Sequence, residues 1–470
     1  MSLAPVILWL RRDLRLADQP ALAAAVESGA PVIPVFILDD DTAKHRKMGG
    51  ASRWWLYHSL VSLDADLRKV GSQLILRPGK SDEILCELAK ETGASAIHCI
   101  RHYEPWWRNA ERALREALPD SVEFTCHDGN YLLPPNAVKT GGGTPFKIYT
   151  PFMRALSQHM PPPKPLVAPK TISAPSAWPE SEELADWQLL PTKPDWSKGM
   201  NGHWTPGEAA ASDRLDQFVD KARKYNETRN LPSTEGTSLL SPHLHFGEIS
   251  PATAWHATMS SGGSVDVFLK ELVWRDYAQN IILQYPEYGH RNARDAFDQL
   301  PWRDMQDPKV KADYVAWTKG QTGYPIVDAG MRQLWALGWM HNRVRMITAS
   351  FLIKHLLIDW REGEQWFWDT LCDADYGSNS VNWQWTAGSG VDSNMFVRIM
   401  APLSQSEKFD SAGYIREWVP ELAALNASTI HDPDEHGVRP KAYPAKIIGH
   451  KEARERALKA HENMKQSPSP

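Results

Sequence analysis

Tryptophan is the residue type in this chain that most clearly indicates a chemical function. The chain has 21 tryptophans in 470 residues, and ten of them lie between Trp274 and Trp385. A hydrophobic core needs apolar bulk but rarely this much indole, which adds a flat stacking face and an oxidisable ring. The enrichment predicts stacking on a flat ligand, electron transfer, or both.

A second candidate site is the segment TSLLSPHLHFGEIS at 237–250. Its hydroxyl residues Thr237, Ser238 and Ser241 precede a helix that can begin near Pro242. A helix N-terminus with hydroxyl donors beside it suits an anion such as a pyrophosphate. Taken alone, the segment fits an ordinary helix-capping motif better than an anion site.

Two further segments place polar groups on one helical face. In FLKELVWRDYAQ, the residues Glu271, Trp274 and Arg275 lie at i, i+3 and i+4. In MHNRVRM, the residues Asn342, Arg345 and Met346 share a face, while Arg343 points elsewhere. An amide next to a soft thioether suits a planar polar ligand. The alternatives are a surface ion pair beside a core tryptophan in the first segment, and capping and packing in the second.

The fourth segment is CDADYGSNSVNWQW at 372–385, which we expect to be non-periodic around Asp373, Asp375 and Asn379. An Asp-x-Asp pair can bind magnesium, but no phosphate-transfer motif accompanies it, so no metal is expected. One of the two arginines at 343 and 345 is the better partner for a carboxylate.

The elements that position these residues fall into two kinds. The first 130 residues alternate apolar runs with amphipathic segments, which predicts a parallel sheet flanked by helices. Strands are expected at 6–10, 32–38, 73–77, 96–100 and 122–126, and helices at 21–28, 52–69, 82–91 and 105–116. Because RRDLRLAD follows the first strand, the glycine-rich dinucleotide fingerprint is missing.

The rest of the chain changes character at about residue 132. A proline-rich connector runs to residue 205, either wrapped over its neighbours or partly loose, with a short helix expected at 149–157. From residue 206 onward, apolar spacing of three and four predicts helices, and the last of them is KEARERALKAHENMKQ. The predicted domains are therefore 1–131, 132–205 and 206–470.

Composition narrows the class of protein. The hydrophobic share of 42% and charged share of 23% are those of a soluble globular protein, and no apolar run predicts a membrane span or a signal peptide. The net charge of −5 means that any nucleic-acid contact would need a local basic face. The four cysteines have no zinc-type spacing, so we expect four free, buried thiols in a reducing cytoplasm.

In this order, the segments resemble the photolyase/cryptochrome flavoprotein family. The resemblance covers nearly the whole chain, through LWLRRDLRLADQPAL, TSLLSPHLHFGEIS, KELVWRDY, GQTGYPIVDAGMRQL, GWMHNRVRMITASFLIKHLLIDWREGE, DADYGSNSVNWQW and QSEKFD. Each segment alone is weak, but the ordered set is very specific. The family's fold is an α/β, Rossmann-like antenna domain, a long connector and an all-α FAD-binding domain, which agrees with the domains predicted above.

The resemblance also implies which residues act. Those that would hold FAD are Tyr225, Thr237, Ser238, Leu239, Leu240, Ser241, Arg275, Arg343, Asp373, Asp375 and Asn379, with Asn379 facing the flavin N5. Those that match the family's electron-passing tryptophans are Trp302, Trp360 and Trp383. Those on the substrate side are Glu271, Trp274, Arg275, Asn342, Arg345, Met346, Trp385 and Lys408, and the candidates for phosphate contacts are Arg229, Arg275, Arg345, Arg398 and Lys408.

Within the family, the sequence favours light-driven repair of cyclobutane pyrimidine dimers in DNA over photoreception by a cryptochrome. It has Asn379 where plant cryptochromes usually carry aspartate, and it most resembles the bacterial class III branch. The expected protein is a cytoplasmic monomer that acts on UV-damaged DNA. Excited reduced flavin would give an electron to the dimer and recover it after the ring splits.

The antenna chromophore is the least defined expectation. Trp106 and Trp107 replace the Asn-Glu pair that holds folate in class I relatives. The antenna therefore either binds differently, stacked on tryptophan, or is not folate. The class III resemblance implies 5,10-methenyltetrahydrofolate, and an 8-hydroxy-deazaflavin or an empty pocket stays open.

Overall fold

The computed structural model describes residues 3–42, 45–262, 265–393 and 396–466. The chain divides into two compact units, which are described separately. Unit 1 comprises Met1–Asp195, Trp204–Arg223 and Ser238–Pro286, and unit 2 comprises Trp196–His203, Lys224–Thr237 and Glu287–Pro470. The predicted domain boundaries after residues 131 and 205 stay a proposal about domain organisation. Among the described residues, no helix combines the length and apolar character needed to cross a bilayer.

Unit 1 is built on a parallel five-stranded sheet, as predicted. Its strands are β1 (Val6–Leu10), β2 (Val32–Leu38), β3 (Ile75–Pro78), β4 (Ala96–Ile100) and β5 (Glu123–His127), in the order β3-β2-β1-β4-β5. The first, second and fourth begin and end at the predicted residues, while β3 and β5 are shifted by one or two. Continuous apolar runs such as VILWL are typical of parallel strands buried on both faces.

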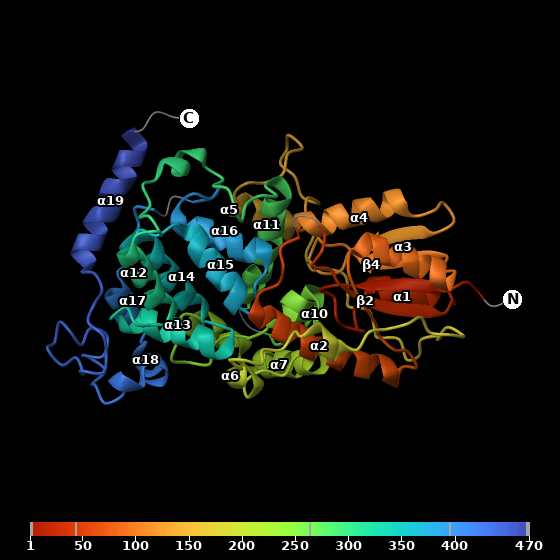
Figure 1. The fold of residues 1–470 in the computed structure, drawn as a ribbon, viewed down its shortest axis with the longest axis horizontal. Helices are drawn as coiled ribbons and strands as arrows, with labels where there is room; N and C mark the ends of the chain where they lie inside the picture. The colour runs from red at the N-terminus through yellow and green to blue at the C-terminus, as the bar shows by residue number, and fades with distance from the viewer. Residues whose placement is uncertain (1–2, 43–44, 263–264, 394–395, 467–470) are drawn as a thin grey trace. The chain divides into compact units, whose positions relative to one another are not determined.

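Helices flank this sheet and extend unit 1 (Figure 1). They are α1 (Pro20–Glu27), α2 (Gly50–Lys69), α3 (Ser81–Thr92), α4 (Pro105–Ala117), α5 (Tyr149–Ser157), α7 (Glu208–Lys221), α9 (Ser241–Phe246), α10 (Pro251–Ser260) and α11 (Asp266–Gln284). Helix α1 packs on β1 and β4, and α3 packs along α4. Proline at the start of α1, α4 and α10 fits the first turn, where its missing N–H has no helical partner to lose.

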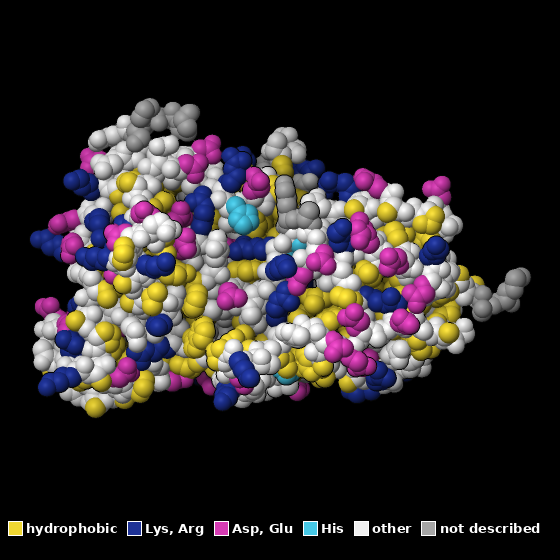
Figure 2. All heavy atoms as spheres, in the orientation of Figure 1, with side chains coloured by type: hydrophobic (Ala, Val, Ile, Leu, Met, Phe, Trp, Pro, Cys, Tyr) yellow, Lys and Arg dark blue, Asp and Glu magenta, His cyan; other side chains and the backbone are white. Residues whose placement is uncertain are grey.

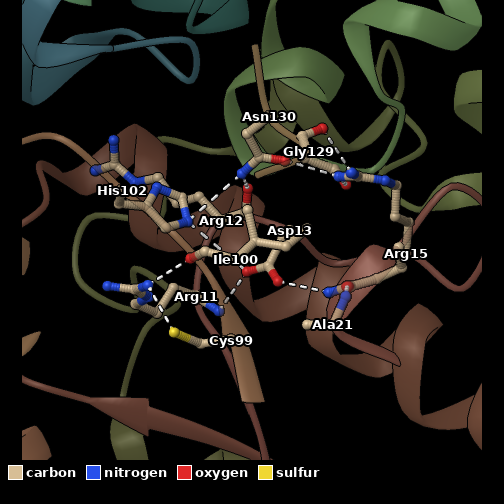
Figure 3. A network of polar contacts seen from close by, with 12 residues as sticks. Arg11, Arg12, Asp13, Arg15, Ala21, Cys99, Ile100, His102, Gly129 and Asn130 are labelled. Atoms are coloured by element: carbon tan, nitrogen blue, oxygen red, sulfur yellow. Dashed lines mark hydrogen bonds and ion pairs between the residues drawn. The ribbon is translucent and has the colours of Figure 1, made fainter. Parts of the chain in front are cut away.

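The segment after β1 forms a buried network of hydrogen bonds and is not a glycine-rich loop (Figure 3). Asp13 accepts from the backbone N–H of Arg11 at 2.7 Å and from Gln19 Nε2 at 2.6 Å. Arg15 Nη1 donates to Asn130 Oδ1 at 2.9 Å, and Asn130 Nδ2 donates to the carbonyl of Arg12 at 2.8 Å. Buried polar groups need such partners, so RRDLRLAD ties the end of β1 to the segment that follows β5.

The proline-rich connector is ordered where it runs along the sheet domain. The backbone N–H of Ile172 donates to the carbonyl of Val70 at 2.8 Å, and Ser173 accepts from the N–H of Val32 at 2.9 Å. These backbone hydrogen bonds satisfy polar groups that a proline-rich chain cannot pair by itself. Of the two possibilities left open by the sequence, wrapping over neighbours is confirmed for this stretch.

Unit 2 is helical, as predicted. Its helices are α6 (Lys198–Asn201), α8 (Tyr225–Thr228), α12 (Pro308–Thr318), α13 (Pro325–Leu337), α14 (Asn342–Ser350), α15 (Trp360–Thr370), α16 (Tyr376–Ala387), α17 (Pro402–Lys408), α18 (Ala412–Trp418) and α19 (His450–Gln466). Helix α13 packs against α14 and α18, and α15 packs against α16. A π-helical turn at Phe351–His355 follows α14.

The cysteines correct one expectation. Cys86, Cys99, Cys126 and Cys372 are free thiols, but only Cys99 and Cys372 are buried. Cys126 is half-buried because it lies on β5, at an edge of the sheet.

Candidate functional site

One candidate surface lies on α11 and is formed by Glu271, Trp274 and Arg275, which we call the α11 face. The indole of Trp274 lies flat against the ring of Tyr149, with ring centroids 3.4 Å apart and planes at 3°. The Tyr149 hydroxyl donates to the carbonyl of Lys270 at 3.2 Å, which fixes the stack to α11. Trp274 remains 39% exposed, so the part of its ring that faces solvent is kept in a fixed position by Tyr149.

Glu271 is half-buried beside this stack. Burial and the nearby carboxylate of Glu271 raise the pKa of Tyr149 above its ordinary value. The phenol therefore stays protonated and neutral at physiological pH. The α11 face thus combines an exposed indole edge with a carboxyl group next to it.

Arg275, the third member of the α11 face, is used inside unit 1. It donates to the carbonyls of Asn130 and Leu244, the latter at 3.2 Å, and its guanidinium lies 4.6 Å from the ring centroid of Tyr131. Two carbonyl acceptors and an aromatic face already occupy this cation. The contacts predicted between Arg275 and the cofactor or a phosphate stay predictions. In the structure, its hydrogen bonds hold α11 against the segments around Asn130 and Leu244.

The two arginines of α14 have different partners. Arg345 makes a bidentate pair with Asp373, at 3.0 and 2.8 Å, and its Nε donates to the carbonyl of Met340 at 2.7 Å. The expected arginine–carboxylate pair is therefore confirmed, and Arg345 is its arginine. A guanidinium engaged in this way is a weaker candidate for a phosphate contact.

Arg343 does not point away from Met346, so that prediction is wrong. Its Nη1 lies 3.6 Å from Met346 Sδ, as residues at i and i+3 of a helix allow. Its Nη2 donates to Asn230 Oδ1 at 2.8 Å, and the guanidinium lies 4.6 Å from the ring centroid of Phe409. Burial, with the charge of Arg229, lowers the pKa of Arg343. Among the described residues, its buried Nε has no hydrogen-bond partner. Asn342, at the start of the same helix, is exposed.

The acidic segment is more regular than predicted, because Asn379 lies within α16. Asp375 caps this helix by accepting from the backbone N–H of Ser378 at 2.6 Å. Such a cap satisfies one of the first-turn N–H groups and offsets the weak helix propensity of glycine and asparagine that follow. The cap places Asp373 before the helix and Asn379 one turn inside it.

The Asn379 amide has a fixed orientation. Its Nδ2 donates to both the carbonyl, at 3.0 Å, and Oε1, at 2.9 Å, of Glu364, and Ser380 Oγ donates to the same Oε1 at 3.0 Å. Glu364 is fully buried on α15. Because the amide nitrogen is engaged by Glu364, the amide oxygen is the remaining polar atom of the Asn379 side chain and can only accept.

Sequence reasoning missed two residues of these sites, Tyr149 and Glu364. Nothing in the spacing links Tyr149 to Trp274, since the two are 125 positions apart. Glu364 did carry a signal, because it lies at i+4 from Trp360 in the part of the chain predicted to be helical. A carboxylate on the face of a core tryptophan requires a buried partner.

The three tryptophans predicted to pass electrons, which we call the relay, differ in exposure. Trp360 is fully buried, with its Nε1 donating to Asn292 Oδ1 at 2.9 Å, and Trp383 is buried. Trp302 is half-buried. The ring of Trp383 meets Phe367 at 5.0 Å and Trp317 at 6.4 Å between centroids, both edge to face. The series thus contains two core indoles and one that reaches solvent.

Gly363 is what allows Trp383 to approach α15. A Cβ at this position would lie 2.1 Å from Trp383 Cη2 and 2.5 Å from Leu352 Cδ2. Gly363→Ala should therefore lower the free energy of unfolding by about 1–3 kcal/mol through overpacking, despite the gain of about 1 kcal/mol in helix propensity. Urea unfolding measures the change.

The matched control is Gly202→Ala, at an exposed position with right-handed φ and open space around a Cβ. It should leave the free energy of unfolding nearly unchanged. Equal effects of the two substitutions would contradict the packing argument.

The hydroxyl-rich segment straddles the division between the units. Tyr225 and Thr237 belong to unit 2, whereas Ser238, Leu239, Leu240 and Ser241 belong to unit 1. Leu239 has a positive φ of 53°, which an L-residue adopts only at a cost. The N–H of Leu240 donates to Ser238 Oγ at 3.3 Å. The helix α9 begins at Ser241, one residue before the predicted start.

The remaining substrate-side candidates are at least partly accessible. Met346 and Trp385 are half-buried, whereas Arg398 and Lys408 are exposed. The ring of Tyr225 lies 5.5 Å from the guanidinium of Arg229. Basic and acidic side chains are interspersed over the face drawn in Figure 2, in keeping with the net charge of −5. Any attraction for phosphates therefore has to be local.

The sheet unit and the helical unit define a two-part protein with an α/β part and an all-α part. Residues 6–170 match the family model described as DNA photolyase, and residues 268–463 match the FAD binding domain of DNA photolyase. A deoxyribodipyrimidine photo-lyase of Agrobacterium fabrum is 49% identical, over 99% of both chains. The chain belongs to the DNA photolyase family.

Two further comparisons refine this placement. The crystal structure of a class III photolyase from Agrobacterium tumefaciens superposes with a TM-score of 0.93 at 48% identity, covering 99% of both chains. The Arabidopsis thaliana protein cryptochrome-1 is 36% identical over 97% of this chain and 70% of its own length. The predicted fold and the predicted likeness to the class III branch are confirmed.

Proposed function

We propose that this protein is a deoxyribodipyrimidine photolyase that uses light and reduced FAD to split cyclobutane pyrimidine dimers in DNA. The observation that carries the proposal is the α11 face, where a partly exposed indole is held flat beside a carboxyl group. Its membership of the DNA photolyase family, with a relative of that name at 49% identity, supports the same reaction.

The residues of unit 2 fit a flavin. Buried Asp373, Asp375 and Asn379 offer acceptors, while the buried Nε of Arg343 is a donor without a hydrogen-bond partner in the described chain. A planar ring edge that alternates donors and acceptors suits such a set. When bound, reduced FAD would supply the electron that opens the cyclobutane ring and would take it back afterwards.

Asn379 and Glu364 would act together on the flavin side. Because Glu364 engages the amide nitrogen, the Asn379 oxygen is the atom available to accept from an N–H such as that at flavin N5. Asn379 is neutral and adds no charge beside an electron-rich ring. The ion pair between Arg345 and Asp373 would then fix the start of this segment. We therefore propose that Arg345 acts beside the flavin and not in a phosphate contact.

The substrate side would recognise a dimer flipped out of the helix. A dimer is poorly stacked and poorly paired, so extruding it costs less than extruding normal bases. We propose Trp274, Trp385, Asn342 and Met346 as side chains that would contact the extruded dimer, the two indoles through their flat apolar faces. The hydroxyls of Thr237, Ser238 and Ser241, with Leu239, Leu240 and Tyr225, would bind the FAD diphosphate side.

Glu271 would hydrogen-bond the carbonyl edge of the dimer. Glu271→Gln keeps the size of the side chain but replaces the ionisable carboxyl group by a neutral amide. Glu271→Ala removes the hydrogen-bonding group altogether. We expect the alanine variant to lower repair per absorbed photon while FAD content, read from the absorption spectrum, stays unchanged. Wild-type repair in Glu271→Ala would remove this residue from the mechanism.

Binding to damaged DNA should weaken steeply with salt, although the chain has a net charge of −5. Each neutralised phosphate contributes about −0.9 to the slope of log K against log salt concentration. Lys408→Ala and Arg398→Ala should each reduce that slope by about one, measured by fluorescence anisotropy over a salt series. Lys451→Ala, an exposed lysine on α19, is the control and should leave the slope unchanged. A salt-independent Kd would contradict the local basic face.

For the antenna we propose 5,10-methenyltetrahydrofolate in unit 1, with a deazaflavin or an empty pocket as the other outcomes. In the described chain, the buried indole N–H groups of Trp9 and Trp107 and the Nε of Arg11 have no hydrogen-bond partner. These donors suit an acceptor-rich heterocycle. Trp106 and Trp107 already pack on His45, at 5.7 and 5.0 Å between centroids, so a stacked ligand would have to displace that ring. An absorption spectrum of the purified protein distinguishes the three outcomes.

The test of the function is blue-light repair of a defined thymine dimer by the chemically reduced protein. Restoration of the two thymines, followed by chromatography, supports the proposal. A cryptochrome-type photoreceptor, the second candidate, would leave the dimers intact under the same light. We further propose that the protein acts as a monomer in the bacterial cytoplasm, where its DNA substrate lies.

A further inference from the structure

Cys99 and Cys126 lie opposite each other on the edge strand β5 and its neighbour β4. They are direct register partners on the parallel strands β4 and β5, and their sulfur atoms are 3.6 Å apart. Adjacent strands lie about 4.8 Å apart, which is within the Cα separation of about 4.4–6.8 Å that a disulfide spans. Cys99 is buried and Cys126 is half-buried on the edge strand, so one residue of the pair is partly accessible.

Two guanidinium groups lie beside this thiol pair, and the Glu111 carboxylate is close to both sulfur atoms. Arg11 Nη2 lies 3.4 Å from Cys99 Sγ and donates to Glu111 Oε1 at 2.9 Å (Figure 3 draws the contact with Cys99). Arg115 Nη2 lies 3.6 Å from Cys126 Sγ. Guanidinium groups stabilise a thiolate, the form of cysteine that reacts with oxidants.

The two sulfurs have different chemical character. The hydrogen bond from Cys99 lowers the pKa of Cys126 to about 7, and the charges of Arg11 and Arg101 act in the same direction. Burial and the same hydrogen bond raise the pKa of Cys99 well above its ordinary value. Cys126 is also the more accessible of the two residues, so it is the expected nucleophile and the buried Cys99 the protonated partner next to it.

A metal site is the competing interpretation. Ligand atoms of Cys99, Glu111 and Cys126 lie within 4.8 Å of one another. The fully buried guanidinium of Arg11 already donates to two of the three groups, however. A metal cation would have to displace that charge or be repelled by it, so oxidation of the thiols is the better use of the pair.

We propose that Cys126 and Cys99 form a reversible redox site that reacts with hydrogen peroxide or another small hydroperoxide. The Cys126 thiolate attacks a peroxide oxygen, the O–O bond breaks, and Cys126 becomes a sulfenic acid while hydroxide leaves and takes up a proton. The Cys99 sulfur then attacks the Cys126 sulfur, forming the S–S bond and releasing a second water. In balance, two thiols and one hydrogen peroxide give one disulfide and two waters.

The disulfide would change the surroundings of Arg11. This guanidinium lies 4.2 Å from the ring centroid of Trp9 and 5.3 Å from that of Trp107. Loss of the Cys99 thiol removes one of its partners at the carboxyl end of β1. The redox site is independent of the proposed repair reaction, since none of its residues belongs to the flavin or substrate side.

The test treats the full-length reduced protein with hydrogen peroxide at neutral pH, blocks remaining thiols with iodoacetamide, and maps peptides by mass spectrometry. We expect a Cys99–Cys126 crosslinked peptide that dithiothreitol reverses. Cys86 is the internal control, because it is also half-buried but burial and its acidic neighbours raise its thiol pKa. Cys126 should react at least about tenfold faster than Cys86, because its thiolate fraction is larger.

Two variants separate the steps. Cys99→Ser should stop at a Cys126 sulfenic acid that dimedone traps, whereas Cys126→Ser should leave Cys99 unoxidised. Oxidation of Cys126 no faster than that of Cys86, or its conversion to sulfinic acid without a crosslink in the wild type, would overturn the proposal. So would stoichiometric zinc retained through dialysis that protects both thiols, since that result assigns the pair to a metal.

Discussion

Trp274→Ala is expected to weaken binding of a dimer-containing oligonucleotide by about 5- to 150-fold, because stacking of a base on an aromatic ring is worth about 1–3 kcal/mol. The structure makes this residue the strongest candidate on the substrate side. Its ring is held at 3.4 Å from Tyr149 yet remains 39% exposed, so little further ordering is needed when a ligand stacks on it. Fluorescence anisotropy with labelled damaged and undamaged strands measures the loss.

The control for this prediction is Trp335→Ala. Trp335 is 52% exposed and also stacks on a neighbour, Trp366, with centroids 6.0 Å apart and planes at 10°. Removing it should leave affinity for the dimer unchanged, which separates loss of a specific platform from loss of any surface indole. Tyr149→Phe should retain the stack and most of the affinity, because it removes only the hydroxyl bonded to Lys270. Equal losses for Trp274 and Trp335 would contradict the α11 face as the dimer site.

Trp360→Phe should slow light-driven reduction of oxidised flavin at least about tenfold. A tenfold slower rate needs a rise of only about 1.4 kcal/mol in the activation barrier for electron transfer. Phenylalanine keeps apolar bulk in the core, but its ring is harder to oxidise than indole. Repair by protein that has been reduced chemically should be unaffected, since the relay supplies electrons only to oxidised flavin. Absorption spectra recorded during blue illumination follow the first quantity, and dimer loss follows the second.

Trp368→Phe is the matched control for the relay. Trp368 is also buried on α15, but it packs edge to face on Tyr376 at 6.5 Å and is not one of the three tryptophans predicted to pass electrons. It should leave photoreduction intact. Normal photoreduction in Trp360→Phe would instead point to a route through other rings on Trp383, such as Trp317 at 6.4 Å.

The parallel sheet could be predicted because each strand is a local apolar run with helical spacing on either side. Three strands have the predicted boundaries, and β3 and β5 differ by one or two residues because strand ends depend on the length of the partner strand. The acidic segment was harder to predict. Its helix depends on the Asp375 cap and on burial against α15, and neither is visible in the local spacing.

The candidate site divides in the same way. Helical spacing placed Glu271, Trp274 and Arg275 on one helix, and motif order alone indicated a flavin protein. Spacing could not choose between Arg343 and Arg345 as the partner of Asp373, because both lie within one turn of α14 and only the position of the acidic segment decides. It also could not find Tyr149, whose contact with Trp274 joins segments 125 positions apart.

By itself, the sequence therefore determined the fold class, the family resemblance and the residue types available for the chemistry. These depend on local periodicity and on ordered motifs, which are properties of neighbouring residues. Only the tertiary structure decided which groups meet: Trp274 with Tyr149, Asn379 with Glu364, and Cys99 with Cys126. Contacts between distant segments are set by packing and by the need to pair buried polar groups, and a single sequence does not display either.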